Sequence, residues 1–219
     1  MKKISILGCG WLGLPLGEYL LTEGYVVKGS VRTEGALVKL EATGIEPYFL
    51  SLDPELKADS AREFLSSGIL IVNFPPERRS DIVAYHTAQI KSLIQAVETS
   101  PVEYVLFVSS TSVYPNVNRE VTEDDKLKPE KDSGAALLEA ERMLHENINF
   151  KTTVLRFGGL IGYDRMPGRF LAGKKEIPNG YAPVNLIHRD DCLGVIGAVI
   201  SKGIWGETLN ACADIHPLR

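Results

Sequence analysis

The stretch Gly8-Cys9-Gly10-Trp11-Leu12-Gly13 follows the largely apolar run Ile4–Leu7 and decides how the chain folds. Its glycines have the G-x-G-x-x-G spacing. The first makes a tight turn, the second lets the backbone approach a pyrophosphate, and the third lets a helix pack on a strand. A simple strand–helix turn can match this spacing by chance among 20 glycines. The preceding strand and following helical stretch favour a phosphate-binding turn, where a helix N-terminus offers free N–H groups.

The composition excludes several classes of function. The 219 residues are 44% hydrophobic and 24% charged, with a net charge of −4, so no global charge favours nucleic acid or an anionic membrane. No apolar run is long enough to span a membrane, and the N-terminus shows no signal segment. The three cysteines form no C-x-x-C pair, which favours free thiols in a reducing cytoplasm. The four histidines have no metal-ligand spacing, so we expect no metal site.

Short β-rich runs alternate with amphipathic stretches, and this pattern predicts an α/β fold: a doubly wound parallel sheet of the NAD(P)-binding Rossmann type. The expected strands are Lys3–Leu7, Val26–Val31, Glu46–Ser51, Ile69–Asn73, Tyr104–Ser109, Thr152–Arg156 and Glu207–Ala211. The expected helices are Leu14–Glu23, Gly35–Ala42, Ala58–Ser66, Ser80–Thr99, Ser133–Glu146 and Arg189–Ser201.

We expect a dinucleotide-binding domain over residues 1–156. Residues 157–219 then form a smaller, substrate-facing part interleaved with the same fold. The pattern becomes irregular and rich in Gly and Pro after Arg156, up to Pro183. The last ten residues read like a strand followed by the entry to another helix, so we expect the chain to be truncated at its C-terminus.

The end of the second expected strand bears on the cofactor. An NAD site usually carries Asp or Glu there to accept hydrogen bonds from the ribose. This strand ends instead in Gly29-Ser30-Val31-Arg32-Thr33, with no acid. A guanidinium suits bidentate contact with a phosphate, so Arg32 and Ser30 favour NADP over NAD. The alternative is that Arg32 is simply a solvated residue after a strand.

Nearly the whole chain resembles the extended short-chain dehydrogenase/reductases, the NAD-dependent epimerase/dehydratase family. Pro115 departs from the family's S-S-x-x-V-Y-G, and Gly159 and Ile161 depart from its L-R-x-x-N-x-Y-G. A subset of nucleoside-diphosphate-sugar epimerase-like proteins is similar in its G-C-G-W-L-G start, its S-S-T-x-V-Y and a late His-Pro, here His216-Pro217. Besides the glycine turn, the motifs that carry the resemblance are Ser51–Asp53, Ile71–Pro76, Val108–Tyr114, Leu155–Gly162 and Leu186–Asp191.

The resemblance implies a role for each of these segments. Ser110 would orient a substrate oxygen as the catalytic serine, and Asp53 would approach the adenine. Arg165 and Arg169 would either bind a substrate anion or remain loop charges, and His188 would either contact substrate or pair with Asp190 or Asp191. The implied cofactor-binding residues are Gly8, Gly10, Trp11, Leu12, Gly13, Arg32, Asp53, Asn73, Phe74 and Pro75, with the side chains of Trp11 and Leu12 expected to pack. The implied substrate-binding residues are Thr111, Tyr114, Arg169 and His188, with Tyr114 expected to pack beneath the pocket.

The family's acid–base pair is missing. A Tyr-x-x-x-Lys pair would lie on one face of the helix at Ser133–Glu146, where the lysine lowers the tyrosine pKa. Aligning Leu138-Glu139-Ala140-Glu141 with the family's L-x-x-E places Ser133 and Leu137 at those two positions. None of the eight tyrosines has a lysine four residues later. A Ser–His–Asp arrangement of Ser110, His188 and Asp191 lacks the G-x-S-x-G nucleophile elbow.

Two functions therefore stay open. One is an NAD(P)-dependent epimerase, dehydratase or reductase that acts on a small molecule such as a nucleotide sugar, with Ser110 orienting the substrate. The other is an NAD(P)-binding sensor or regulatory protein without redox turnover. A third reading is a scaffold whose dinucleotide site stays empty. We expect no nucleic-acid or membrane partner, and a homodimer.

Overall fold

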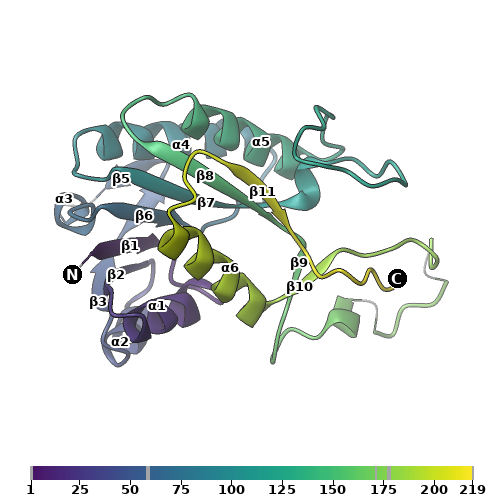
Figure 1. Ribbon diagram of the computed structural model, residues 1–219, viewed down its shortest axis with the longest axis horizontal. Helices are drawn as coiled ribbons and strands as arrows, with labels where there is room; N and C mark the ends of the chain where they lie inside the picture. The colour runs from purple at the N-terminus through teal and green to yellow at the C-terminus, as the bar shows by residue number, and fades with distance from the viewer. Residues whose placement is uncertain (1, 58–59, 171, 177–178, 219) are drawn as a thin grey trace.

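The computed structural model describes residues 2–57, 60–170, 172–176 and 179–218, without the side chains of residues 169 and 170. Its centre is a parallel sheet of seven strands in the order β3-β2-β1-β6-β7-β8-β11 (Figure 1). The strands are β1 (Lys3–Leu7), β2 (Val26–Val31), β3 (Glu46–Phe49), β6 (Ile69–Val72), β7 (Tyr104–Ser110), β8 (Lys151–Phe157) and β11 (Thr208–Ala211).

The strand order fixes where a ligand can bind. The chain runs outward from β1 to β2 and β3, then crosses back to β6 on the other side of β1. In such a sheet the loops leave β1 and β6 in opposite directions, which opens a crevice at the carboxyl ends of these strands. The glycine turn follows β1 and therefore lies in this crevice.

Helices cover both faces of the sheet (Figure 1). Leu16, Leu40 and Ile196, from three helices, belong to the core on one face, and Phe64, Leu93 and Leu144, also from three helices, belong to the core on the other. Strands buried on both faces need continuous apolar runs, which is why β6 reads Ile-Leu-Ile-Val. The first face carries α1 (Gly13–Thr22), α2 (Glu34–Glu41) and α6 (Arg189–Lys202), and the second carries α3 (Ala61–Phe64), α4 (Ile82–Glu98) and α5 (Asp132–His145). Among the described residues, no helix has the length and apolar character to cross a membrane.

A smaller region lies beyond the carboxyl ends of the main strands (Figure 1). Its strands β9 (Gly159–Ile161) and β10 (Leu186–His188) pair in parallel, and the short 3-10 helix η2 (Pro167–Phe170) lies between them in the chain. After β10 the chain returns to the main sheet through α6 and β11.

Most elements begin and end within two residues of their expected bounds, with three corrections. The strand expected over Glu46–Ser51 stops at Phe49, and Ser51–Asp53 instead forms β4 of a hairpin with β5 (Glu55–Lys57). The helix expected over Ala58–Ser66 shrinks to α3, with residues 58 and 59 outside the described range. The segment expected to be irregular contains β9, whose three residues are too few to show a pattern.

A buried ion pair joins α5 to the middle of the sheet. The guanidinium of Arg156 (β8) lies 2.6 Å from the carboxylate of Glu141 (α5), and both side chains are almost fully buried. Ser109, at the end of β7, donates to the same carboxylate. Arg156 also donates to the hydroxyl of Tyr114, which donates to Asn210 of β11 at 3.0 Å. The network ties three strands and a helix together at Ser109, the residue before Ser110.

Glu141→Ala should lower the free energy of unfolding by about 3 kcal/mol, because it leaves the Arg156 charge buried without its partner. Urea denaturation measures this loss. The matched control is Glu139→Gln on the same helix, whose exposed ion pair with Arg142 should be dispensable. Equal losses for the two variants would contradict a special role for the buried pair.

Candidate functional site

The glycine turn is built so that only its middle glycine faces open space. A methyl group on Gly8 would lie 2.4 Å from the carbonyl oxygen of Asn73, and Gly8 has a φ of +109°, which favours glycine. A methyl group on Gly13 would lie 2.2 Å from the Gly8 carbonyl oxygen. A methyl group on Gly10 would meet nothing within 4 Å. The first and third glycines therefore serve packing, and Gly10 leaves room for a ligand.

The two strands that flank β1 hold this turn in place. Ser30, at the end of β2, accepts a hydrogen bond from the Gly8 N–H at 3.0 Å, and Asn73, after β6, donates its side-chain amide to the Gly8 carbonyl at 2.9 Å. Ser30 is buried. The prediction that Ser30 helps to hold a 2′-phosphate is therefore wrong, because its hydroxyl faces the turn.

The turn fits a pyrophosphate. The first hydrogen bond of α1 runs from the Leu14 N–H to the Gly10 carbonyl at 3.0 Å. The N–H groups of Trp11 and Leu12 precede it, and such groups at a helix start have no partner within the helix. They sit beside the open space at Gly10, at the positive end of the helix dipole.

Trp11 and Leu12 pack as expected, and Trp11 also joins the turn to the smaller region. Leu12 is buried in the core. The Trp11 indole donates to Asp164 at 2.7 Å, and the guanidinium groups of Arg165 and Arg189 lie 5.3 and 5.1 Å from its ring centroid. These contacts hold the loop after β9 and the start of α6 against the glycine turn.

Arg32 does not stand alone after β2. Its guanidinium lies 2.7 Å from the carboxylate of Glu77, a residue in the loop after β6. Sequence reasoning missed Glu77, because nothing in the pattern signals that a residue 45 positions away returns to Arg32.

Asp53 and Phe74, two of the expected cofactor-binding residues, contact α4. Asp53 (β4) accepts a hydrogen bond from the Tyr85 hydroxyl on α4, which raises the pKa of Tyr85. Phe74 packs edge-on against the buried His86, with ring centroids 5.4 Å apart, and Pro75 is exposed beside it. Burial lowers the pKa of His86, so its ring is neutral at pH 7. Tyr85 lies on the apolar face of its helix but carries no sequence signal for this contact.

Ser110, Thr111 and Tyr114 lie where β7 ends and the 3-10 helix η1 (Thr111–Val113) begins. The Ser110 hydroxyl accepts from the Ser112 N–H at 3.1 Å and remains partly exposed, and Thr111 is partly exposed beside it. The Tyr114 hydroxyl accepts from Arg156 and donates to Asn210, so it is already engaged on both sides. Ser110 is therefore the better-placed hydroxyl for a substrate oxygen.

The helix α5 offers no acid–base pair at the family's positions. Leu137 is only 6% exposed and belongs to the core on that face of the sheet. A methyl group on Gly134 would lie 2.3 Å from the Ser112 carbonyl oxygen, so the start of the helix is pressed against η1. Ser133 lies in the first turn of this helix, and its hydroxyl has too high a pKa to replace a phenol.

His188 ends β10 beside an exposed tyrosine. Its Nδ1 accepts from the Asp190 N–H at 3.2 Å, and its ring packs edge-on against that of Tyr163. Tyr163 donates to the Asp190 carboxylate, which raises the pKa of Tyr163. A general base needs the opposite shift. Arg169 lies in η2, and its side chain is outside the described part of the structure.

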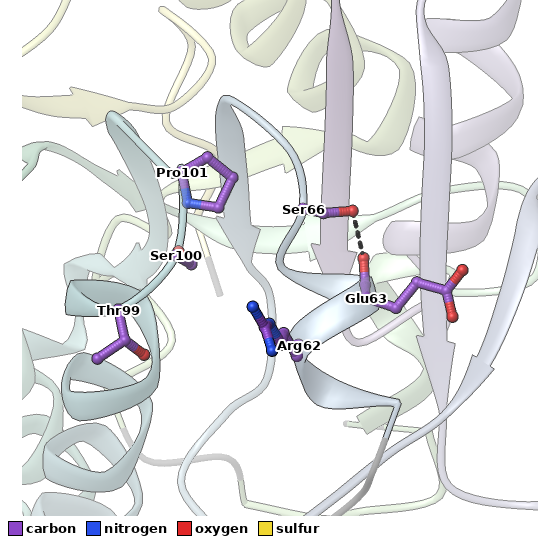
Figure 2. A pocket seen from close by; sticks show the side chains of 6 residues that line it. All are labelled: Arg62, Glu63, Ser66, Thr99, Ser100 and Pro101. Atoms are coloured by element: carbon purple, nitrogen blue, oxygen red, sulfur yellow. Dashed lines mark hydrogen bonds between the residues drawn. The ribbon is translucent and has the colours of Figure 1, made fainter.

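A separate concavity of about 510 Å³ lies at the opposite, amino-terminal edge of the sheet, between α3 and the end of α4 (Figure 2). Its lining includes Arg62, Thr99 and Ser100, and Ser66 donates to the Glu63 carbonyl at 2.7 Å. Its lining contains none of the expected cofactor-binding or substrate-binding residues. It also contains no Tyr–Lys pair of the kind that the family uses as its acid–base centre. The described residues also contain no cluster of three or more metal-ligating side chains.

Gly8→Ala should lower the melting temperature by about 5 °C, since the added methyl group meets backbone and the φ is unfavourable for alanine. Gly10→Ala is the matched control and should melt with the wild type, because its methyl group enters open space. Differential scanning calorimetry measures both. A destabilised Gly10→Ala together with an unaffected Gly8→Ala would contradict this geometry.

Comparisons with known proteins agree with this arrangement. Residues 5–177 match the model of the NAD dependent epimerase/dehydratase family. The Escherichia coli K12 protein YeeZ is 34% identical over 221 residues, spanning all of this chain and 80% of YeeZ.

Two solved structures share the fold at lower identity. A conserved protein of unknown function from Silicibacter pomeroyi superposes with a TM-score of 0.78 at 23% identity, covering 100% of this chain and 74% of that one. The UDP-glucuronic acid 4-epimerase of Bacillus cereus, in complex with UDP-glucuronic acid and NAD, superposes with a TM-score of 0.79 at 20% identity, covering 99% and 79%. The sequence match and the shared fold lead to one conclusion: the chain belongs to the NAD-dependent epimerase/dehydratase family.

Proposed function

We propose that this chain binds a nicotinamide dinucleotide across the carboxyl ends of β1, β2 and β6 and presents it to a small-molecule substrate. The observation that carries the proposal is the contrast within the glycine turn: Gly8 and Gly13 are closed by backbone, whereas Gly10 is open. Such an opening beside the N–H groups of a helix start suits a pyrophosphate. The family's description as NAD dependent supports the same cofactor.

For the choice between the two dinucleotides, the position of Arg32 after β2 supports NADP. A guanidinium there can make a bidentate contact with a 2′-phosphate, which NAD lacks. The ion pair with Glu77 works against that preference.

For the substrate, we propose a nucleotide sugar or a similar hydroxyl compound. The Bacillus cereus neighbour is described with UDP-glucuronic acid. In this chain Ser110 and Thr111 would orient the reacting oxygen, while Tyr114, Arg169 and His188 would line the substrate side. A bound nicotinamide would supply hydride chemistry, and Ser110 would hold the substrate hydroxyl towards it by hydrogen bonding.

A second candidate is a dinucleotide-binding sensor without redox turnover. The burial of Leu137 favours this candidate. Leu137 stands at the position of the family's ribose-binding lysine and is packed in the core, so it offers no charged group to the ribose. Tyr114 and Tyr163 do not fill the gap, since the hydroxyl of each is held by neighbouring side chains.

For the compartment, we propose the cytoplasm. All three cysteines are free, and Cys9 and Cys192 are buried. Burial raises the pKa of the Cys9 thiol to about 12, so it stays protonated and inert at pH 7. Unpaired thiols of this kind are usual in a reducing environment.

The two candidates differ in hydride exchange. If the chain is an enzyme, it should convert nucleotide sugars in the presence of the oxidised dinucleotide, or their keto derivatives in the presence of the reduced one. A net oxidation or reduction changes the nicotinamide absorbance, whereas an epimerase or dehydratase regenerates its cofactor and is detected by its sugar product. Ser110→Ala should then lower the rate by about 100-fold, as loss of a transition-state hydrogen bond does. Ser112→Ala, an exposed neighbour, is the matched control and should keep the rate.

Calorimetric titration of NAD and NADP completes the test. Tight binding with no change in nicotinamide absorbance and no new sugar product across the panel would establish the sensor function instead. If neither dinucleotide binds the wild type even at high concentration, both candidates are contradicted and the scaffold reading remains.

A further inference from the structure

The ion pair between Arg32 and Glu77 joins the loops on the two sides of β1. Arg32 follows β2 and Glu77 follows β6, and these strands lie on opposite sides of β1. Neighbouring strands are about 4.8 Å apart, so the two loops are separated by about 10 Å. The side chains close that distance across the carboxyl end of β1, where the glycine turn begins.

The bridge brings a carboxylate to the position that β2 lacks. Strand β2 ends without the acid that accepts hydrogen bonds from the ribose of NAD, and Arg32 stands there instead. Glu77 supplies an acid at the same place from a different strand. The site therefore contains both chemical groups that distinguish the two dinucleotides: a guanidinium for a 2′-phosphate and a carboxylate for a 2′-hydroxyl.

In the loop after β6, Glu77 pairs with Arg32 and not with Arg79, which is nearer in the chain. The nearby Arg79 is held by Asp81, and its guanidinium stacks 3.6 Å from the centroid of the Tyr85 ring. Arg79 is thus engaged elsewhere. The Arg32 and Glu77 side chains are 69% and 39% exposed, so solvent screens the pair and a ligand can displace it at little cost.

We propose that Glu77 determines dinucleotide specificity by restraining the preference of Arg32 for NADP. Paired with Arg32, the Glu77 carboxylate neutralises the guanidinium, repels a 2′-phosphate and accepts a hydrogen bond from a 2′-hydroxyl. NADP must displace Glu77 from Arg32, whereas NAD binds with the pair intact. The inference rests on the proposed binding of a nicotinamide dinucleotide in this crevice.

The test is the ratio of NADP to NAD affinity, measured by isothermal titration calorimetry at about 0.15 M ionic strength. Glu77→Gln should raise this ratio by about fivefold, the size of effect expected for one exposed ion pair. Arg32→Ala should lower the ratio. In the Arg32→Ala background, Glu77→Gln should no longer raise it, because the guanidinium that it frees is gone.

Glu34→Gln is the matched control. Glu34 lies two residues from Arg32 at the start of α2, and the variant removes the same charge as Glu77→Gln. The ion pairs found among the described residues do not join Glu34 to Arg32. It should leave the ratio nearly unchanged. An equal rise of the affinity ratio for Glu34→Gln and Glu77→Gln would show that the effect comes from the change in local net charge, and it would overturn the proposal.

The titrations distinguish a failure of this inference from a failure of the proposed function. If both dinucleotides bind and Glu77→Gln leaves the ratio of their affinities unchanged, Glu77 does not determine specificity, while the proposed dinucleotide binding stands. If neither dinucleotide binds the folded wild type or any variant, the proposed function and this inference both fall. Thermal unfolding of each variant shows that it is folded.

Discussion

The rest of the site depends on how the two neighbours of β1 hold Gly8. Ser30 accepts from its N–H, Asn73 donates to its carbonyl, and the backbone at Asn73 leaves no room for a side chain on it. These contacts fix a glycine with positive φ between three strand ends. The direction of α1 follows from that turn, and so does the opening at Gly10. The geometry of the glycine turn is thus a property of three strands rather than of one loop.

A second set of contacts supports the end of β7 independently of the first. The Glu141–Arg156 pair lies under Ser109, and Tyr114 links it to Asn210 on the last strand. This framework keeps the end of β7 in place although the acid–base pair of the family is absent above it. Ser133 and Leu137 occupy the positions of the family's acid–base pair, so this framework supports Ser110 without that pair. The contacts around Gly8 and those around Glu141 share no residue, so the proposed cofactor binding and the proposed chemistry can be tested separately.

The sequence predicted the main sheet well because its central strands are largely buried and rich in apolar and β-branched residues, as in the Ile-Leu-Ile-Val of β6. The three-residue strands β4, β5, β9 and β10 were missed, as such short strands depend on their partners and carry little pattern of their own. Motifs singled out the glycine turn and Ser110, and their roles stay predictions. The inward hydroxyl of Ser30 and the return of Glu77 to Arg32 were not, because both follow from tertiary geometry.

Binding of a dinucleotide pyrophosphate in the open space at Gly10 is best tested by a crystal structure of the protein soaked with NADP. Pyrophosphate oxygens should lie within hydrogen-bond distance of the N–H groups of Trp11 and Leu12, with the contacts around Gly8 unchanged. A dinucleotide bound away from this turn, for example in the concavity beside Arg62, or a turn left empty at saturating NADP, would contradict it.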